Sequence, residues 1–274
     1  MSMHNNAVKN NLPGGQTLTQ LLEVAIEAAQ SAGQILVHHY GKPHDIVKKG
    51  AVDLVTEADL ASEKAIVALL QHKTPQITIM AEEQSDSHTL NQTETLWVVD
   101  PLDGTTNFAH GFPFFSVSIA LLQAGKPLVG VVYAPMLEEL FCAQTGGGAT
   151  LNNTPIRTST ADTLIEALVA TGFPYERRAQ LPRIMQQLQA VLHHVQDVRR
   201  AGSAAIDLAY VACGRLDAYY EVQLSPWDTA AGWLLVEEAG GRVTGIDGAA
   251  YSPFIPQILA SNGHVHGALR QLLV

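Results

Sequence analysis

Two aspartates three positions apart, Asp100 and Asp103, lie in the segment Trp97-Val98-Val99-Asp100-Pro101-Leu102-Asp103-Gly104-Thr105-Thr106-Asn107-Phe108. Residues 96–99 are apolar and partly β-branched, which favours a buried strand, and Pro101 disfavours helix at Asp100. After the pair, Gly104 permits close backbone approach, and the following residues offer hydroxyls and helix N-cap chemistry. Carboxylates suit hard cations and helix N-termini suit phosphate, so the segment could hold a cation with its phosphate. The same residue types also make an ordinary turn that binds nothing.

Other acids occupy comparable positions, after an apolar stretch or at the start of an expected helix. Each has a simpler interpretation: Glu82 and Glu83 as a solvated turn, Asp228 as a helix N-cap, and Asp59 as a first-turn acid favoured by the helix dipole. Together with the central aspartate pair, these residues supply enough anionic oxygens for two or three divalent cations.

The composition is that of a large globular chain with an excess of acid. It has 274 residues, 47% of them hydrophobic, and 26 acidic against 16 basic residues, with no basic run. This balance argues against direct nucleic-acid binding. Cys142 and Cys213 lie far apart without metal-type spacing, which is typical of reduced thiols in the cytosol. We see neither a signal sequence nor a membrane-spanning run, so the sequence predicts a cytoplasmic protein with no membrane partner.

Apolar periodicity predicts a mixture of helices and strands without an internal repeat. Residues 1–16 are expected to form a flexible tail, and residues 17–274 a single domain. The pattern favours an α/β or α+β layered fold. Helices are expected over 17–40, 183–195, 202–212, 228–239 and 266–273, and a further helix is expected to follow the Asp53–Asp59 turn and to end at about residue 71. Strands are expected over 77–80, 96–99, 114–122, 128–133, 141–143, 164–170, 218–221 and 258–259.

Two further patterns invite a cofactor interpretation that we do not favour. The pairs His38-His39, His193-His194 and His264/His266 lack the closed ligand spacing of a zinc site, so structural or surface roles are expected. Gly146-Gly147-Gly148 lacks the lysine and the strand-to-helix context of a nucleotide-binding loop, and it is interpreted as a tight hairpin.

With these residues in view, the chain resembles the inositol monophosphatase family, the lithium-sensitive, magnesium-dependent sugar-phosphate phosphatases. The resemblance covers roughly residues 17–270 and is highly specific for the superfamily, but less so for the substrate. It implies an α-β-α-β-α sandwich of two intimate halves, about 17–150 for metal and phosphate and about 151–274 for substrate, and a homodimer. Its motifs are Asp53–Asp59, Ala81-Glu82-Glu83, the 97–108 segment, Ala201–Ala205 and Trp227–Gly232.

The resemblance also implies a role for individual residues. Those assigned to the first Mg²⁺ are Glu82, Asp100 and the carbonyl of Leu102; those assigned to the second are Asp100, Asp103 and Asp228, with Glu82 helping a weaker third. The pair assigned to orienting and deprotonating the attacking water is Asp59 and Thr105. The phosphate would be received by the N–H groups of Gly104, Thr105 and Thr106. The alcohol part would be contacted by Gly202, Ser203, Ala204 and Glu221. Lys48 matches a lysine near the active site, with a solvated side chain as the alternative.

The residue types agree with hydrolysis of a phosphate monoester. One metal would lower the pKa of a bound water while its neighbour stabilises the leaving alkoxide. Thr105 is not expected to act as a covalent nucleophile, because no histidine or lysine is placed by the sequence to activate it. We therefore expect direct in-line attack by water without a phosphoenzyme.

The residues around the expected alcohol pocket bear on the substrate. Ser225-Pro226 stands where animal-type members commonly carry a histidine, and Gly172–Tyr175 and Arg199–Ser203 look bacterial. Inositol 1-phosphate is the leading choice because Glu221 and the 202–204 turn match that branch best. Fructose 1,6-bisphosphate, histidinol phosphate and 3′-phosphoadenosine 5′-phosphate are the alternatives. A hypothesis of another class is an accessory protein to the transcription machinery, which would act through a protein surface because the net charge is −10.

Overall fold

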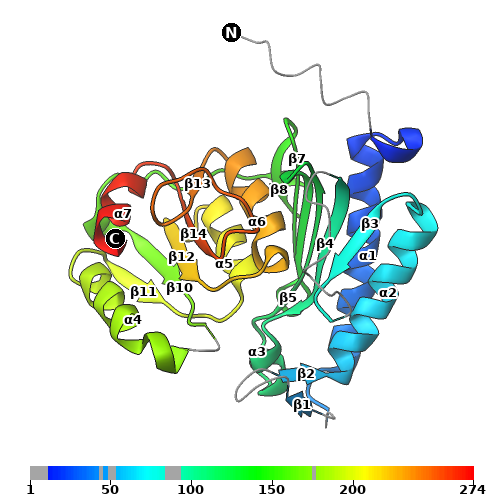
Figure 1. Ribbon diagram of the computed structural model, residues 1–274, viewed down its shortest axis with the longest axis horizontal. Coiled ribbons are helices and arrows are strands. Elements are labelled where there is room, and N and C mark those ends of the chain that lie inside the picture. Colours follow the sequence, from blue (N-terminus) through cyan, green and yellow to red (C-terminus); the bar gives the residue numbers. More distant parts are fainter. Residues whose placement is uncertain (1–11, 43–45, 49–53, 84–93, 175–176) are drawn as a thin grey trace.

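The computed structural model describes residues 12–42, 46–48, 54–83, 94–174 and 177–274. Helices and two large sheets alternate in layers (Figure 1). The helices are α1 (Leu18–His39), α2 (Glu57–Lys73), α3 (Thr105–Ala109), α4 (Arg177–Leu192), α5 (Ala204–Ala212), α6 (Pro226–Glu238) and α7 (His266–Leu273). The strands are β1 (Ile46–Lys48), β2 (Leu54–Thr56), β3 (Thr78–Ala81), β4 (Thr95–Asp103), β5 (Ser116–Gln123), β6 (Lys126–Ala134), β7 (Glu139–Gln144), β8 (Gly148–Leu151), β9 (Thr154–Pro155), β10 (Leu168–Thr171), β11 (Asp197–Arg199), β12 (Ala218–Val222), β13 (Arg242–Thr244) and β14 (Gln257–Ser261).

The first sheet has seven strands in the order β3-β4-β5-β6-β7-β8-β9, and only its β3–β4 pair is parallel. Successive residues of a strand point to opposite faces, and β4 is apolar on both. Trp97 and Val99 pack with the outer helices α1 and α2, whereas Leu96 and Val98 pack with the inner helices α5 and α6. The strand that carries the aspartate pair is therefore buried on both sides.

The second sheet has five strands in the order β11-β10-β12-β14-β13. It follows the same rule, because Tyr219 of β12 packs toward α5 and α6 while Ala218 and Tyr220 pack with residues of α4 and α7. The layers are thus α1/α2, sheet, α5/α6, sheet, α4/α7, which confirms the layered α-β-α-β-α sandwich (Figure 1). No described helix is long and apolar enough to cross a membrane.

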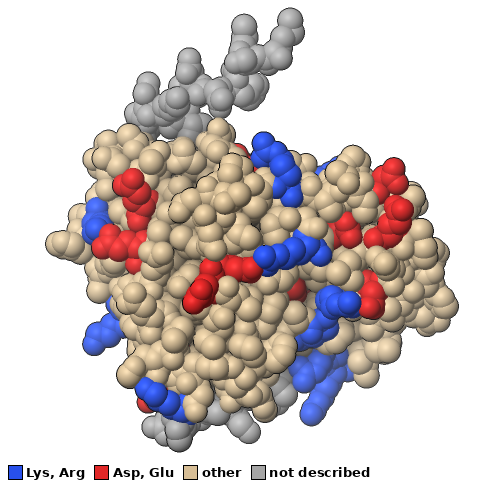
Figure 2. Space-filling model, turned by 180° about the vertical axis from the view of Figure 1, so that it is seen from behind, with Lys and Arg blue, Asp and Glu red and all other residues tan. Residues whose placement is uncertain are grey.

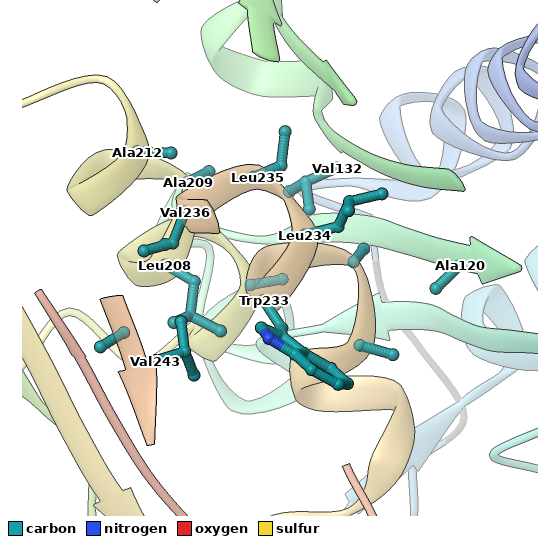
Figure 3. Packing of buried hydrophobic residues seen from close by; sticks show 14 of the residues in the cluster. Ala120, Val132, Leu208, Ala209, Ala212, Trp233, Leu234, Leu235, Val236 and Val243 are labelled. Atoms are coloured by element: carbon teal, nitrogen blue, oxygen red, sulfur yellow. The ribbon is translucent and has the colours of Figure 1, made fainter. Parts of the chain in front are cut away.

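The middle layer is built from small residues, which let both sheets approach it closely. Helix α6 is buried from Thr229 to Val236, and Trp233 and Leu234 belong to one buried cluster with Leu208 of α5 (Figure 3). Gly130 of β6 faces this helix, and a Cβ atom at position 130 would lie 2.8 Å from the carbonyl oxygen of Ala231. The absence of a side chain at Gly130 thus sets how closely α6 lies against the first sheet.

Several expected elements differ from the structure. β4 continues through Asp103 instead of ending at residue 99, and its register with β5 shifts between Asp100 and Asp103. The aspartate pair thus flanks an irregularity within a strand. Residues 164–166 form a 3-10 turn, so the strand expected over 164–170 is only partly correct. The helix expected over 183–195 begins at Arg177 and ends at Leu192. Of the expected tail, residues 1–11 lie outside the described residues, and 13–15 form a 3-10 turn.

Gly130→Ala is expected to destabilise the fold by about 1–3 kcal/mol, because the added methyl group meets backbone atoms that cannot move aside cheaply. Gly267→Ala in α7 is the matched control, since no atom lies within 4 Å of a Cβ built there. The control should be neutral or should stabilise by up to about 1 kcal/mol. Equilibrium urea denaturation measures both, and equal midpoints for the two variants would contradict the packing argument.

Candidate active site

Three carboxylates from two distant parts of the chain meet at one point. Asp100 and Asp103 come from β4 and Asp228 from α6, and each offers an oxygen within 4.8 Å of the others. Asp100 and Asp103 are almost completely buried, with 2% and 8% of their surface exposed. Glu82, which follows β3, lies near enough for its charge to raise the pKa of Asp100 and of Asp228. The structure therefore brings together three of the four acidic side chains that were expected to bind metal, and Glu82 lies outside this 4.8 Å group but near enough for its charge to act on two of its members.

Burial and mutual repulsion make this cluster unfavourable as four bare anions. Burial raises the pKa of Asp100 well above its usual range, and the charges of Glu82 and Asp103 raise it further. Burial likewise raises the pKa of Asp228, with the charge of Asp103 as the next cause. The pKa of Asp103 rises to about 6 through burial, although its hydrogen bonds act in the opposite direction. A hard divalent cation fits such a set of closely spaced oxygens, since it removes the repulsion that raises these pKa values.

Backbone N–H groups at helix starts hold two of these carboxylates in place. Oδ2 of Asp228 accepts a hydrogen bond of 2.7 Å from the N–H of Ser225, the N-cap of α6. Asp103 accepts hydrogen bonds from the N–H groups of Ala204 and Ala205, at 3.3 and 2.8 Å, at the start of α5. Free N–H groups and the helix dipole favour negative charge at such positions. Asp228 is thus a helix-capping residue and a member of the cluster at once.

The two carboxylate oxygens of Asp59 accept hydrogen bonds from different parts of the chain. Oδ2 accepts the backbone N–H of Thr56 at 2.8 Å, closing a capping box at the start of α2. Oδ1 accepts the hydroxyl of Thr105 at 3.1 Å. Burial raises the pKa of Asp59 to about 6. The Thr105 hydroxyl also lies 3.0 Å from the carbonyl oxygen of Leu102, so its single proton can serve only one of these two acceptors at a time.

Gly104 shapes the turn between these groups. It has a φ of 100°, in the left-handed region, and a Cβ atom there would lie 3.1 Å from the carbonyl oxygen of Phe114. Only glycine adopts this conformation without strain. α3 begins at the next residue. Gly104, Thr105 and Thr106 line a cavity of about 620 Å³ that Asp103 and Asp228 also line.

The residues expected to contact the alcohol line the same cavity: Gly202, Ser203, Ala204 and Glu221. Glu221 accepts a hydrogen bond from the hydroxyl of Tyr219 through Oε2. Burial raises the pKa of Glu221 to about 7. Lys48 ends β1, and its side chain lies outside the described part of the structure.

One polar face of α2 was missed by sequence reasoning. Ser62 donates a hydrogen bond of 2.8 Å to the carbonyl of Pro101, and Glu63 accepts one of 2.7 Å from the N–H of Glu83. Together with Asp59, these residues connect one helix to the ends of β3 and β4 and to α3. The spacing of Thr56 and Asp59 is a readable capping-box signal, whereas the contacts of Ser62 and Glu63 follow only from tertiary packing.

The side chain of Asn107 was also missed. Its Nδ2 donates to the carbonyl oxygens of Phe114 and Ala201, at 2.6 and 2.9 Å. Ala201 begins the turn that precedes α5, so this amide connects α3 to that turn. Asn107 stands in the central sequence segment, but its partner 94 positions away cannot be read from the sequence.

The histidine pairs have the structural or surface roles that were expected. His38 is exposed at the end of α1. His266 is buried between the hydroxyls of Thr244 and Ser261, at 2.9 and 2.8 Å. Burial lowers the pKa of His266 to about 4, so this imidazole is neutral.

Comparison with known proteins identifies the family to which this chain belongs. The model of the inositol monophosphatase family matches residues 17–274. The chain is 47% identical to the inositol-1-monophosphatase of Synechocystis sp., covering 92% of this chain and 88% of that one. It is 42% identical to the Nus factor SuhB of Escherichia coli, covering 91% and 94%. The solved structure of an inositol monophosphatase from Anabaena superposes with a TM-score of 0.85 at 43% identity, covering 93% and 96%. The chain therefore belongs to the inositol monophosphatase family and is a phosphatase.

Proposed function

We propose that this phosphatase hydrolyses inositol 1-phosphate, or a similar small polyol phosphate, in a Mg²⁺-dependent reaction with direct attack by water. The observation that carries the proposal is the meeting of Asp228 with Asp100 and Asp103 within 4.8 Å beside the cavity. The names of the Synechocystis and Anabaena relatives support the substrate. Family resemblance further leads us to propose a cytoplasmic homodimer that lithium inhibits.

The residues that would hold Mg²⁺ are the clustered acids Glu82, Asp100, Asp103 and Asp228 and the carbonyl of Leu102. When bound, Mg²⁺ would lower the pKa of water in the site and stabilise negative charge on the leaving oxygen. The chain itself contributes rigidity, because helix-start N–H groups fix Asp103 and Asp228 before any ligand arrives. The N–H groups of the 104–106 turn would bind the phosphate.

Asp59 and Thr105 are arranged to orient the attacking water. The hydroxyl of Thr105 lies within donating distance of Asp59, whose other oxygen is occupied by Thr56. When Thr105 donates to Asp59, the lone pairs of its hydroxyl oxygen are left to accept a hydrogen bond from the water. Asp59, with a pKa of about 6, is ionised at neutral pH and can serve as the general base.

Asp100→Asn is expected to lower Mg²⁺-dependent phosphate release by more than about 100-fold, because even outer partners of metal ligands typically contribute 10–100-fold. Release is measured with inositol 1-phosphate, fructose 1,6-bisphosphate, histidinol phosphate and 3′-phosphoadenosine 5′-phosphate. The exposed Asp162→Asn is the matched control. Full activity of the Asp100 variant would overturn the metal assignment, and strong preference for another of the four substrates would overturn inositol 1-phosphate.

Metal-free protein should lose stability as the pH rises. Asp59 and Asp103 have pKa values of about 6 in the folded state against an ordinary value of 3.8, so the folded state binds more protons than the unfolded state between these pH values. Their contribution to the free energy of unfolding therefore falls as pH rises through that window. Calorimetry in EDTA should show a lower Tm at about pH 7.5 than at about pH 5, and MgCl₂ should raise Tm more at the higher pH. An equal MgCl₂ effect at both pH values would contradict this.

A second candidate function is an accessory role in transcription, which the name of the Escherichia coli relative favours. The net charge of −10 argues against direct RNA binding. On the face shown in Figure 2, basic side chains gather toward the lower right with a few acidic side chains beside them, and elsewhere the two kinds are interspersed. Such a role would therefore use a protein–protein surface.

Asp100→Asn separates the two functions in cells. We expect it not to rescue the phenotype of a strain that lacks this protein, because hydrolysis depends on Asp100. The measurement is growth of the deletion strain carrying the wild-type or the variant gene, with equal protein levels checked by immunoblot. Rescue by the variant would show that an interaction role, and not catalysis, explains the phenotype.

A further inference from the structure

Asp207 is a buried carboxylate for which the fold provides no hydrogen-bond donor. It lies in α5, has 2% of its surface exposed and lines the cavity. Among the described residues, none donates a hydrogen bond to its carboxylate. Asp217, also buried in this half of the chain, shows the usual situation, since it accepts 2.5 and 2.6 Å bonds from Ser159 and the N–H of Leu168. Buried polar groups are normally paired in this way, so the oxygens of Asp207 are left to hydrogen-bond to whatever fills the cavity, whether solvent or a ligand.

Glu221 faces the same cavity and lies close to Asp207. After burial, the charge of Glu221 is the next cause that raises the pKa of Asp207 well above its usual range. Glu221 accepts the Tyr219 hydroxyl through Oε2, which leaves Oε1 for a ligand. A Cβ atom at Gly172 would overlap the Glu221 carboxylate, so this carboxylate occupies the space that the glycine leaves. The alcohol side of the cavity thus carries two carboxylates with uncommitted oxygens.

Arg200 offsets part of this charge without occupying the carboxylates. Its guanidinium lies 5.5 Å from the ring centre of Phe173, at the lining of the cavity. Its positive charge lowers the pKa of both Asp207 and Glu221. It forms no ion pair with either of them within 4.0 Å among the described residues. The carboxylates are therefore kept available as hydrogen-bond acceptors, near a charge that lies over an aromatic face.

We propose that Asp207 is a specificity residue that, together with Glu221, accepts hydrogen bonds from hydroxyl groups on the alcohol part of the substrate. The inference depends on the proposed function, because it assumes that the acidic cluster and the 104–106 turn hold the phosphate end. The oxygens of two adjacent carboxyl groups accept hydrogen bonds from several hydroxyls, and the negative charge that these groups carry when ionised repels a second phosphate. The substrate class is therefore a polyhydroxylated alcohol that carries a single phosphate.

The test compares Asp207→Asn with the wild type on inositol 1-phosphate, on phenyl phosphate, which has no hydroxyl on its leaving group, and on fructose 1,6-bisphosphate. The ratio of kcat/KM for inositol 1-phosphate to that for phenyl phosphate should fall about tenfold, mainly through KM, as expected for a lost hydrogen bond to a charged group. The ratio for the bisphosphate to phenyl phosphate should rise. The Tm of the variant should not fall, because a buried carboxylate without a donor is removed.

Asp217→Asn is the matched control, and it should lower Tm while leaving both ratios unchanged, because Asp217 is paired inside the fold. Unchanged ratios in Asp207→Asn would overturn the inference. So would a wild-type preference for ethanolamine phosphate over inositol 1-phosphate that is lost in Asp207→Asn, since the carboxylates would then bind an ammonium group. Failure of the wild type to hydrolyse any of these compounds with Mg²⁺ would instead overturn the proposed function, and this inference with it.

Discussion

Repulsion among buried carboxylates is the constraint on which the rest of the structure depends. Asp100, Asp103 and Asp228 offer oxygens within 4.8 Å of each other, with Asp100 and Asp103 buried and Asp228 part-buried beside the cavity. Taking charges out of water and placing them side by side is unfavourable, as their raised pKa values show. The surrounding layers must therefore be stable enough to hold the acids together, and the stored repulsion is then available to bind a cation.

Several carboxylates around the cavity use one oxygen for a hydrogen bond within the protein and keep the other for a different partner. Asp59 and Asp228 each use one oxygen to close a capping arrangement at the start of a helix. Glu221 uses one oxygen for the hydroxyl of Tyr219. In each case the hydrogen bond to the protein fixes the orientation of the carboxylate side chain. The second oxygen is thereby held in a defined direction. A site built in this way is preorganised, because its side chains need little rearrangement when a ligand arrives.

The middle layer explains how residues from both sheets reach one cavity. α5 and α6 are packed between the sheets, and glycine and alanine in and around them permit the close approach. Both helices begin near the end of β4. The N–H of Ala205 in α5 donates a hydrogen bond to Asp103, and the N–H of Ser225, just before α6, donates one to Asp228. Asn107 links the same region to the turn before α5. The position of α5 and α6 between the two sheets thus determines both the packing of the core and the placement of the charged side chains in the site.

Local pattern was enough to predict α1 and the strands β5 and β6, because apolar periodicity acts over a few positions, whereas the order of the layers was expected from the family resemblance. The sequence by itself also determined which acids are candidates, since the motif residues and the Thr56–Asp59 spacing are local. It did not reveal short strands such as β1, β11 and β13, whose conformation depends on their partners, or the continuation of β4 through Asp103. Only the tertiary structure decided that Asp228 meets Asp100 and that Asp207 faces a cavity without a donor. Both are relations between residues far apart in the chain, and such relations arise only when the layers pack.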